Sequence, residues 1–180
     1  SWSTVGGDGP FSDCDNLKNV TFEAGTTRIA QNLFGDCKGL EKIEIPDTVQ
    51  SIENQAFYKC GSLTDVKIGS EVTKIGYGAF EDCGKLAAIM IPDSVVEIGS
   101  YSFSECKSLS SVKLSSNLKT LEYGAFYNCD KLTSIMIPKS LEKATSWSTV
   151  GGDGPFSDCD NLKNVTFEAG TTRIAQNLFG

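Results

Sequence analysis

Hydrophobic and polar positions recur along the chain with a period of 23 residues. Each unit begins with Phe, has Cys three residues later and Leu three residues after that, and then alternates apolar and polar residues. In the segment after Leu63, this alternation predicts a short strand with Val66 and Ile68 facing inward and Asp65 and Lys67 facing outward.

The second half of each unit predicts a return segment. In many units a Pro or Gly follows the strand, and Pro ends a strand because it cannot donate a backbone hydrogen bond. Val72 and Ile75 then predict an inward-facing return segment, and the Ala-Phe-x-x-Cys stretch predicts a short helical or 3₁₀ turn. One unit cannot bury its own apolar face, but stacked units can. We therefore expect a solenoid of parallel strands with a Phe and a Leu column in its core.

The repeats define a single domain over residues 1–180. The cysteine spacings are 23 residues five times and then 30, so the sixth unit carries seven extra residues. The expected units are 11–33, 34–56, 57–79, 80–102, 103–125, 126–155 and 156–178. Residues 1–35 are identical to residues 146–180, which indicates duplication of a block of six units or an engineered concatenation. We interpret the chain as a fragment of a larger natural protein.

A weaker alternation links units in twos. Pro46, Pro92 and Pro138 lie 46 residues apart, and the units between them have Gly69 and Ser115 at that position. Met90 and Met136 likewise alternate with Lys67 and Lys113. The unit is therefore expected to have spread by doubling.

The stretch IPDSVVEIGSYSFSECKSLSSVKL, residues 91–114, resembles the BspA-like, or Treponema-type, leucine-rich repeat. The seven units carry this pattern in phase. The resemblance implies a leucine-rich-repeat solenoid with a parallel β-sheet on its concave side and short turns and strands elsewhere. It also implies a cell-surface or secreted protein, because similar proteins of anaerobic bacteria and some parasitic protists act as adhesins or bind host proteins. The segment 141–155 departs from the pattern.

Composition narrows the function further. With 16 Lys and Arg against 23 Asp and Glu, the formal charge is −7, which argues against nucleic acid and anionic membranes as partners. No apolar run is long enough to predict membrane insertion, and residues 1–10 do not resemble a signal peptide. The chain has no His and no acid–base constellation, so we expect neither an enzyme nor a cofactor.

The seven cysteines are predicted to form a buried, reduced column. Neighbouring strands are close enough for disulfides, but side chains in one column point in parallel and seven is an odd number. A metal site is disfavoured because ligands 23 residues apart lie on a line. Asp153, Asp158 and Asp160 are read as turn residues rather than calcium ligands. The sequons at Asn19 and Asn164 are attributed to chance.

The outward strand positions provide the candidate binding surface. Two columns of such positions run along the stack, and charged residues crowd the first half while small or apolar residues fill the second. Methionine gives adaptable contact surfaces, and exposed apolar patches often mark interfaces. Trp147, in the seven-residue insert, is either an interface anchor or a replacement for missing core beside Ala144. The candidate partner-binding residues are Ala88, Met90, Ser111, Lys113, Ser134, Met136 and Trp147.

These patterns favour a non-catalytic recognition module that binds a protein, such as a host extracellular protein, or a glycan through the concave sheet. Two alternatives remain: an architectural spacer of a larger surface protein, or a repeat region attached to an enzyme elsewhere in the chain. Uncapped end coils are also expected to favour end-to-end self-association.

Overall fold

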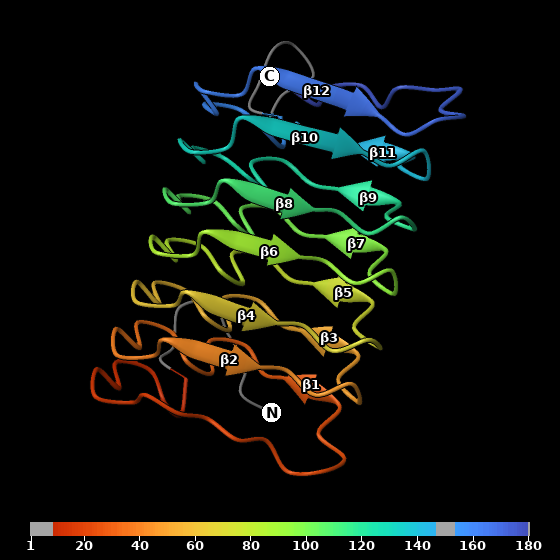
Figure 1. Cartoon of the computed structure of the whole chain (residues 1–180). Helices are drawn as coiled ribbons and strands as arrows, with labels where there is room; N and C mark the ends of the chain where they lie inside the picture. Colours follow the sequence, from red (N-terminus) through yellow and green to blue (C-terminus); the bar gives the residue numbers. More distant parts are fainter. Residues whose placement is uncertain (1–8, 147–153, 180) are drawn as a thin grey trace.

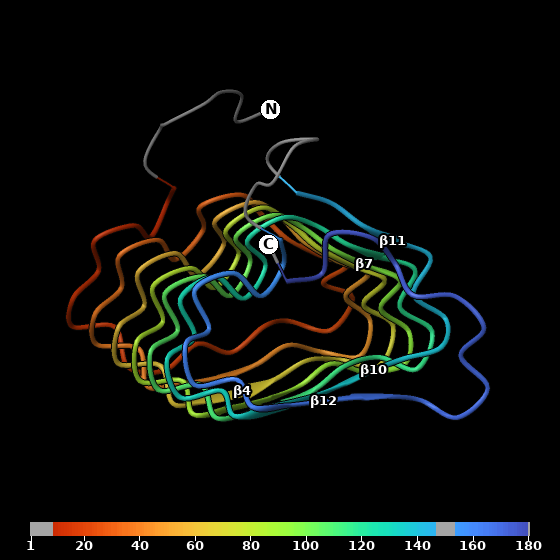
Figure 2. The ribbon, with the colours of Figure 1, turned by 90° about the horizontal axis from the view of Figure 1, so that it is seen from above.

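The structure is a computed structural model that describes residues 9–146 and 154–179. In these residues the chain winds into stacked coils, with longer strands along one side and shorter strands along the opposite side (Figures 1 and 2). Every strand pair is parallel. The longer strands are β2 (Lys42–Glu44), β4 (Asp65–Lys67), β6 (Ala88–Met90), β8 (Ser111–Lys113), β10 (Ser134–Ile137) and β12 (Asn164–Phe167).

The shorter strands, two residues each, form one continuous six-stranded sheet in the order β1-β3-β5-β7-β9-β11. Each shorter strand contributes an inward Ile, Leu or Ala that pairs in register with the corresponding apolar residue of the next coil. The shorter strands are β1 (Arg28–Ile29), β3 (Ser51–Ile52), β5 (Lys74–Ile75), β7 (Glu97–Ile98), β9 (Thr120–Leu121) and β11 (Lys143–Ala144).

The longer strands pair only in twos, as β2-β4, β6-β8 and β10-β12. The first strand of each pair is followed by Pro46, Pro92 or Pro138, so the 46-residue alternation has a counterpart in the hydrogen bonding. In the β2-β4 pair the second unit has Gly69 at this position, and in the β6-β8 pair it has Ser115. A Cβ atom at Gly69 would lie 2.1 Å from the Pro46 carbonyl oxygen, so a side chain there requires the backbone to move.

The predicted helical or 3₁₀ turns are not confirmed. The described residues form consecutive hydrogen-bonded turns around each Phe and contain no helix. The reason is visible at the turn around Phe34. Asn32 and Asp36 have φ values of 51° and 59°, and a left-handed residue on either side of Phe34 interrupts a right-handed helical turn. Asp and Asn tolerate this conformation better than most residues do.

Stacked Phe rings form the centre of the core. From Phe34 to Phe156, neighbouring rings lie 5.1–5.5 Å apart, with interplanar angles of 5–16°. Phe57, Phe80 and Phe103 are fully buried. Truncation of such a ring to Ala costs about 3–5 kcal/mol, so this column is a main source of stability.

The cysteine column is buried beside the Phe stack, as predicted, from Cys37 to Cys159. Each of these six thiols donates to the carbonyl oxygen of the Phe in the preceding coil, over 3.0–3.3 Å. Cys thus combines small apolar volume with a donor for a buried carbonyl group. Burial raises the pKa of the Cys60 and Cys106 thiols to about 12. Their reduced state in solution stays a prediction.

The seven-residue insert leaves the stack continuous. After β11 the structure describes Thr145 and Ser146, and it resumes at Gly154. The Gly124 amide donates to the Gly154 carbonyl oxygen over 3.1 Å, and the Phe126 amide donates to that of Pro155 over 2.7 Å. β12 then pairs with β10 along four residues despite the longer connection.

Candidate protein-binding surface

Six of the seven predicted binding residues lie together on the outer face of β6, β8 and β10. Strand alternation places them there, because the residues between them point into the core. Ile89 and Ile135 are buried and Val112 is half-buried. The strand register sets Ala88 beside Ser111 and Met90 beside Lys113. We call Ala88, Met90, Ser111, Lys113, Ser134 and Met136 the strand patch, and all six side chains are exposed.

Two methionines and one lysine dominate the strand patch. Met90 is 65% exposed and Met136 is 58% exposed, which is high for large apolar side chains on a sheet. Lys113 lies beside Met90 on the neighbouring strand, and no carboxylate of the described residues forms an ion pair with it. The patch therefore combines two exposed apolar side chains with one lysine that forms no ion pair among the described residues.

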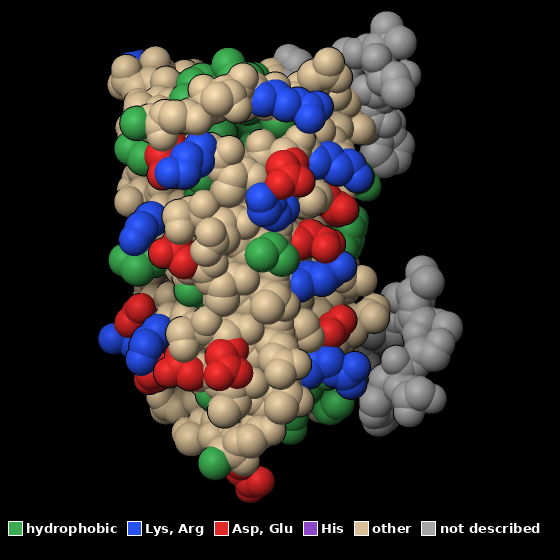
Figure 3. Space-filling view, turned by 90° about the vertical axis from the view of Figure 1, so that its right-hand side faces the viewer, with side chains coloured by type: hydrophobic (Ala, Val, Ile, Leu, Met, Phe, Trp, Pro, Cys, Tyr) green, Lys and Arg blue, Asp and Glu red, His purple; other side chains and the backbone are tan. Residues whose placement is uncertain are grey.

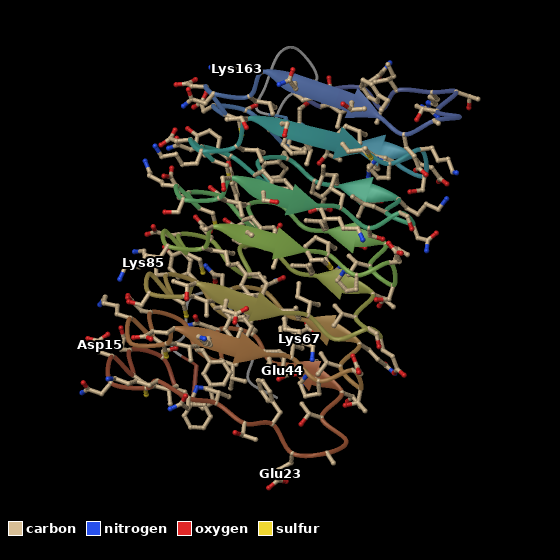
Figure 4. The ribbon with its side chains drawn as sticks, viewed as in Figure 1. Asp15, Glu23, Glu44, Lys67, Lys85 and Lys163 are labelled. Atoms are coloured by element: carbon tan, nitrogen blue, oxygen red, sulfur yellow. The ribbon has the colours of Figure 1, made fainter. Side chains whose placement is uncertain are left out.

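The same face differs at β2 and β4. Lys42 lies opposite Asp65 in the register, and Lys67 forms an ion pair with Glu44 (Figure 4). These charges compensate one another across the strand pair. Exposed pairs of this kind contribute little to stability, but they keep the surface hydrated. The predicted contrast between a charged and a low-charge half of the face is therefore present in the structure.

Hydrogen bonds fix the turn at the edge of the strand patch. There the Ser116 amide donates to the Asp93 carboxylate over 2.9 Å. The equivalent bond outside the patch, after β2 and β4, runs from the Ser70 amide to the Asp47 carboxylate over 2.7 Å. These backbone hydrogen bonds lower the pKa of Asp93 and of Asp47. The charge of Lys113 lowers the pKa of Asp93 further. The strand patch therefore ends at an anchored turn.

The seventh predicted residue, Trp147, lies outside the described residues, as do Asp153 and the rest of the insert up to it. Ala144 on β11 occupies the column that holds Ile98 and Leu121 in earlier coils. Those two are fully buried, whereas Ala144 is partly exposed. Ala144 thus fills less of the core than Ile98 and Leu121 do. This smaller side chain was the reason for considering Trp147 as a replacement for missing core.

Residues considered for other chemistry lie apart from one another. Within residues 9–146 and 154–179, no group of three or more acidic or cysteine side chains is arranged to hold a metal ion. Asp158 is an exposed turn residue with a φ of 55°, which fits the turn interpretation of the acids. Asn19 and Asn164 of the two sequons are exposed.

The sequence analysis missed a second surface, made of tyrosines. All five tyrosines of the chain come from the turns around the Phe column of four neighbouring coils. The signal was in the alignment of the units, where their positions coincide or adjoin. We call the following residues the tyrosine surface: Tyr58, Tyr77, Tyr101, Tyr123 and Tyr127.

Elsewhere the surface is mixed in charge. Figure 3, which views the right-hand side of Figure 1, shows Lys, Arg, Asp and Glu side chains interspersed along the whole stack. Lys74 pairs with Glu97, and Lys119 pairs with Glu142. No helix in the described part of the chain has the length and apolar character that crossing a bilayer requires.

The parallel strands, the one-residue columns and the coil period define a leucine-rich-repeat solenoid. The family model described as a BspA-type leucine-rich repeat region of six copies matches residues 4–95, 27–148 and 73–180. The chain therefore belongs to the BspA-type leucine-rich repeat family, as the repeat motif indicated. Among curated proteins, no sequence matches it.

Solved structures of bacterial leucine-rich repeat proteins resemble the chain. The T. pallidum leucine-rich repeat protein is 30% identical, with a TM-score of 0.72 over 79% of this chain and 64% of that one. A leucine-rich repeat protein from Eubacterium ventriosum is 26% identical, with a TM-score of 0.68 over 91% and 41%. The pneumococcal vaccine antigen PcpA is 25% identical, with a TM-score of 0.63 over 83% and 38%. The chain thus spans less than two thirds of each of these structures, and none of their descriptions names an enzymatic activity.

Proposed function

We propose that the chain is a non-catalytic recognition module of a cell-surface or secreted protein. It binds a partner protein through the strand patch, on the side that we expect to be concave. The observation that carries this proposal is the presence of two highly exposed methionines beside one lysine that forms no ion pair among the described residues, all on one strand face. Such a surface offers apolar anchors and a charge that selects the partner's orientation.

The comparisons support the class of function. The family and the similar structures are repeat proteins, and one of them is described as a vaccine antigen. A repeat scaffold supplies an extended surface, and specificity then resides in the outward residues. Here those outward residues change from charged to apolar along the face, so we place the binding at β6, β8 and β10.

Substitution of the strand patch tests the proposal. Replacing Met90 and Met136 with Glu adds two charges to a contact that would be desolvated. Outward residues contribute nothing to the core, so the melting temperature should stay within about 2 °C, while affinity for the partner should fall at least tenfold. Val96→Glu is the matched control, because Val96 is an exposed apolar residue outside the longer strands.

The partner is first identified by cross-linking of the 180-residue chain to extracellular host proteins. Identification alone does not support the proposal. Retention of full affinity in the double Glu variant, with a normal melting temperature, would show that the strand patch does not bind. Trp147, in the seven-residue insert, would then be the next residue to substitute.

An architectural spacer is the second candidate, and the continuous core favours it. The Phe stack runs without a break from Phe11 to Phe179, across the insert. A continuous stack transmits rigidity along its axis. A glycan is less favoured as the partner of the strand patch because Met90 and Met136 offer no polar groups. Failure to cross-link any protein specifically would favour the spacer.

A further inference from the structure

Two identical segments lie at opposite ends of the described stack. Residues 9–34, the first copy, and residues 154–179, the second copy, have the same sequence, and their strands β1 and β12 lie far apart (Figure 1). The first copy pairs with the coil that follows it, and the second copy pairs with the coil that precedes it. Each copy therefore shows in the structure a set of contacts that the other copy has the residues to make.

The coil of residues 35–56, which we call the acceptor coil, binds the first copy closely. Its strand β3 pairs with β1, so that Ile52 lies beside Ile29. The Glu53 amide donates to the Ile29 carbonyl oxygen over 2.9 Å. Ile29 is fully buried in this arrangement. The acceptor coil thus has a face that fits this particular sequence.

The second copy exposes the groups that the acceptor coil binds in the first copy. Ile174, the counterpart of Ile29, is 58% exposed, and Phe179 is 42% exposed. Within the described part of the chain, no hydrogen bond reaches the carbonyl oxygens of Thr172 and Ile174. Their counterparts in the first copy both accept from amides of the acceptor coil. The second copy therefore has an unused surface that matches the acceptor coil residue for residue.

The second copy is also ordered in advance of such a contact. In the first copy, residues 19–22 form no strand and Phe11 is 49% exposed, so the acceptor coil is the neighbour that holds it. The second copy is held by four paired residues between β12 and β10. Docking of the first copy must order its whole backbone, whereas docking of the second copy orders little more. This difference lets a second copy from another molecule compete with the tethered first copy.

We infer that, in the 180-residue chain, the second copy of one molecule docks on the acceptor coil of another and displaces the first copy of that molecule. The contacts are exchanged one for one because the sequences are identical, and exchange of an identical element is a low-cost route to association. Phe34 and Phe179 hold the same place in the two copies, so one of them must leave the Phe column at the junction. Phe179 is the more exposed of the two and gives way.

Repetition of the exchange extends the assembly. A molecule whose acceptor coil is occupied still has its own second copy, and a head-to-tail contact of this kind closes into a ring or continues as a filament. The strands β6, β8 and β10 take no part in the exchange. The inference is therefore independent of the function proposed for the strand patch.

Zero-length cross-linking with a carbodiimide tests the exchange, because this reagent joins a carboxylate to an amine with loss of water and adds no spacer. Within one molecule, the Lys38 ammonium lies 3.7 Å from the Asp15 carboxylate and 3.1 Å from that of Asp36. Asp160 is the counterpart of Asp15. It lies five coils away from Lys38 in the same molecule, about 24 Å at the usual spacing of neighbouring strands. A link between Lys38 and Asp160 therefore requires two molecules in the exchanged arrangement.

Mass spectrometry distinguishes the two links, because trypsin places Asp15 in residues 1–18 and Asp160 in residues 144–163. As protein concentration rises, we expect the Lys38–Asp160 link to increase and the Lys38–Asp15 link to decrease. The average mass from light scattering should rise in parallel. Absence of the Lys38–Asp160 link at every concentration would overturn the inference. Assembly without this link would show simple stacking of ends, which leaves the first copy in place, and would overturn it equally.

Matched substitutions in the two copies should act in opposite directions. Ile174→Asp puts a charge where the acceptor coil would bury it, at a site that is exposed in the single molecule. It should lower the Lys38–Asp160 link by about tenfold and leave the melting temperature unchanged. Ile29→Asp weakens the first copy instead, so it should free the acceptor coil and raise the link several-fold. A change in the same direction for both variants would contradict the exchange. If Ile29→Asp fails to fold by circular dichroism, the native chain and Ile174→Asp decide the test.

Discussion

Two regions of this molecule have the same amino-acid sequence and different structures. Residues 9–34 and 154–179 are identical, and both form turns with left-handed residues at equal places. The φ values are 57° and 55° at Asp13 and Asp158, and 89° and 87° at Gly25 and Gly170. The strands differ. The first copy forms β1 but no strand at residues 19–22, and the second forms β12 but no strand at residues 173–174.

The difference follows from which neighbour each copy has. The first copy is followed by another coil, so its short strand β1 pairs with β3. The second copy is preceded by one, so its long strand β12 pairs with β10. Turn geometry is thus encoded locally, by residues that tolerate positive φ, whereas strand formation requires a neighbouring coil. Identical sequence is sufficient for the turns and insufficient for the sheet.

Burial also depends on the neighbouring coil. At one position of the unit the second copy is the more buried, and at another position the first copy is. The Phe that opens the unit is 49% exposed at Phe11 and 3% exposed at Phe156. The Ile of the short strand is fully buried at Ile29 and 58% exposed at Ile174. Neither copy is therefore simply the better packed one. Each is packed on the side where its neighbour lies.

The largest expected effect concerns the Phe pair. Phe156→Ala removes a ring stacked between Phe126 and Phe179 and should lower the free energy of unfolding by about 3–5 kcal/mol. Phe11→Ala removes a half-exposed ring and should cost less than about 1.5 kcal/mol. Urea unfolding of both variants, followed by circular dichroism, measures the two costs. Equal costs would mean that the sequence of the unit, and not its neighbour, sets the packing.

For the equivalent residues Ile29 and Ile174, the larger loss of stability is expected in the first copy, the reverse of the Phe pair. Ile29→Ala should cost about 2–5 kcal/mol, because Ile29 is a fully buried core residue paired with Ile52. Ile174→Ala should cost less than about 0.5 kcal/mol, as is usual for exposed sites. The same urea experiment compares them. We predict the larger loss of stability in the second copy for Phe and in the first copy for Ile. A larger loss in the second copy for both residues would contradict this prediction.

The cysteines give a smaller, kinetic effect. Cys159 is buried and donates to the Phe126 carbonyl oxygen, while Cys14 is only partly buried. Iodoacetamide at pH 8 should label Cys14 at least tenfold faster than Cys159, because the reagent can reach the partly exposed Cys14 while packing shields Cys159. Mass spectrometry separates the two copies, since cleavage after Lys143 leaves two extra residues, Ala144 and Thr145, on the second tryptic peptide. Equal labelling rates, or a disulfide in the unreduced chain, would contradict the account.

The sequence predicted most of the repeating structure because alignment of the units shows which positions keep the same type of residue. The Phe and Cys columns, the inward Ile residues and the outward strand patch all follow from a strict period, and the structure places them so. The helical or 3₁₀ turn expected around the Phe of each unit is not confirmed, and hydrophobic spacing carries no information on left-handed φ values such as those of Asn32 and Asp36. In the sequence, the pairing of long strands in twos was visible only as an alternation of Pro with Gly69 or Ser115.

The candidate sites were less predictable. The strand patch could be located because outward positions of a strand are fixed by alternation. The tyrosine surface was missed because its five residues occupy three different positions of the unit and meet only across coils. Packing between coils, not the pattern within one coil, creates this surface.

Amide hydrogen exchange measured by NMR tests the central claim most directly, because it compares the two identical copies residue by residue. In the second copy, the amides of Asn164 and Glu168 donate to Thr133 and Ile137 of the preceding coil. In the first copy, the Asn32 amide donates to Asn54 of the following coil. We predict slow exchange at Asn164, Glu168 and Asn32, and fast exchange at their counterparts Asn19, Glu23 and Asn177. Matching exchange rates in the two copies would contradict the claim that the neighbouring coil determines the sheet.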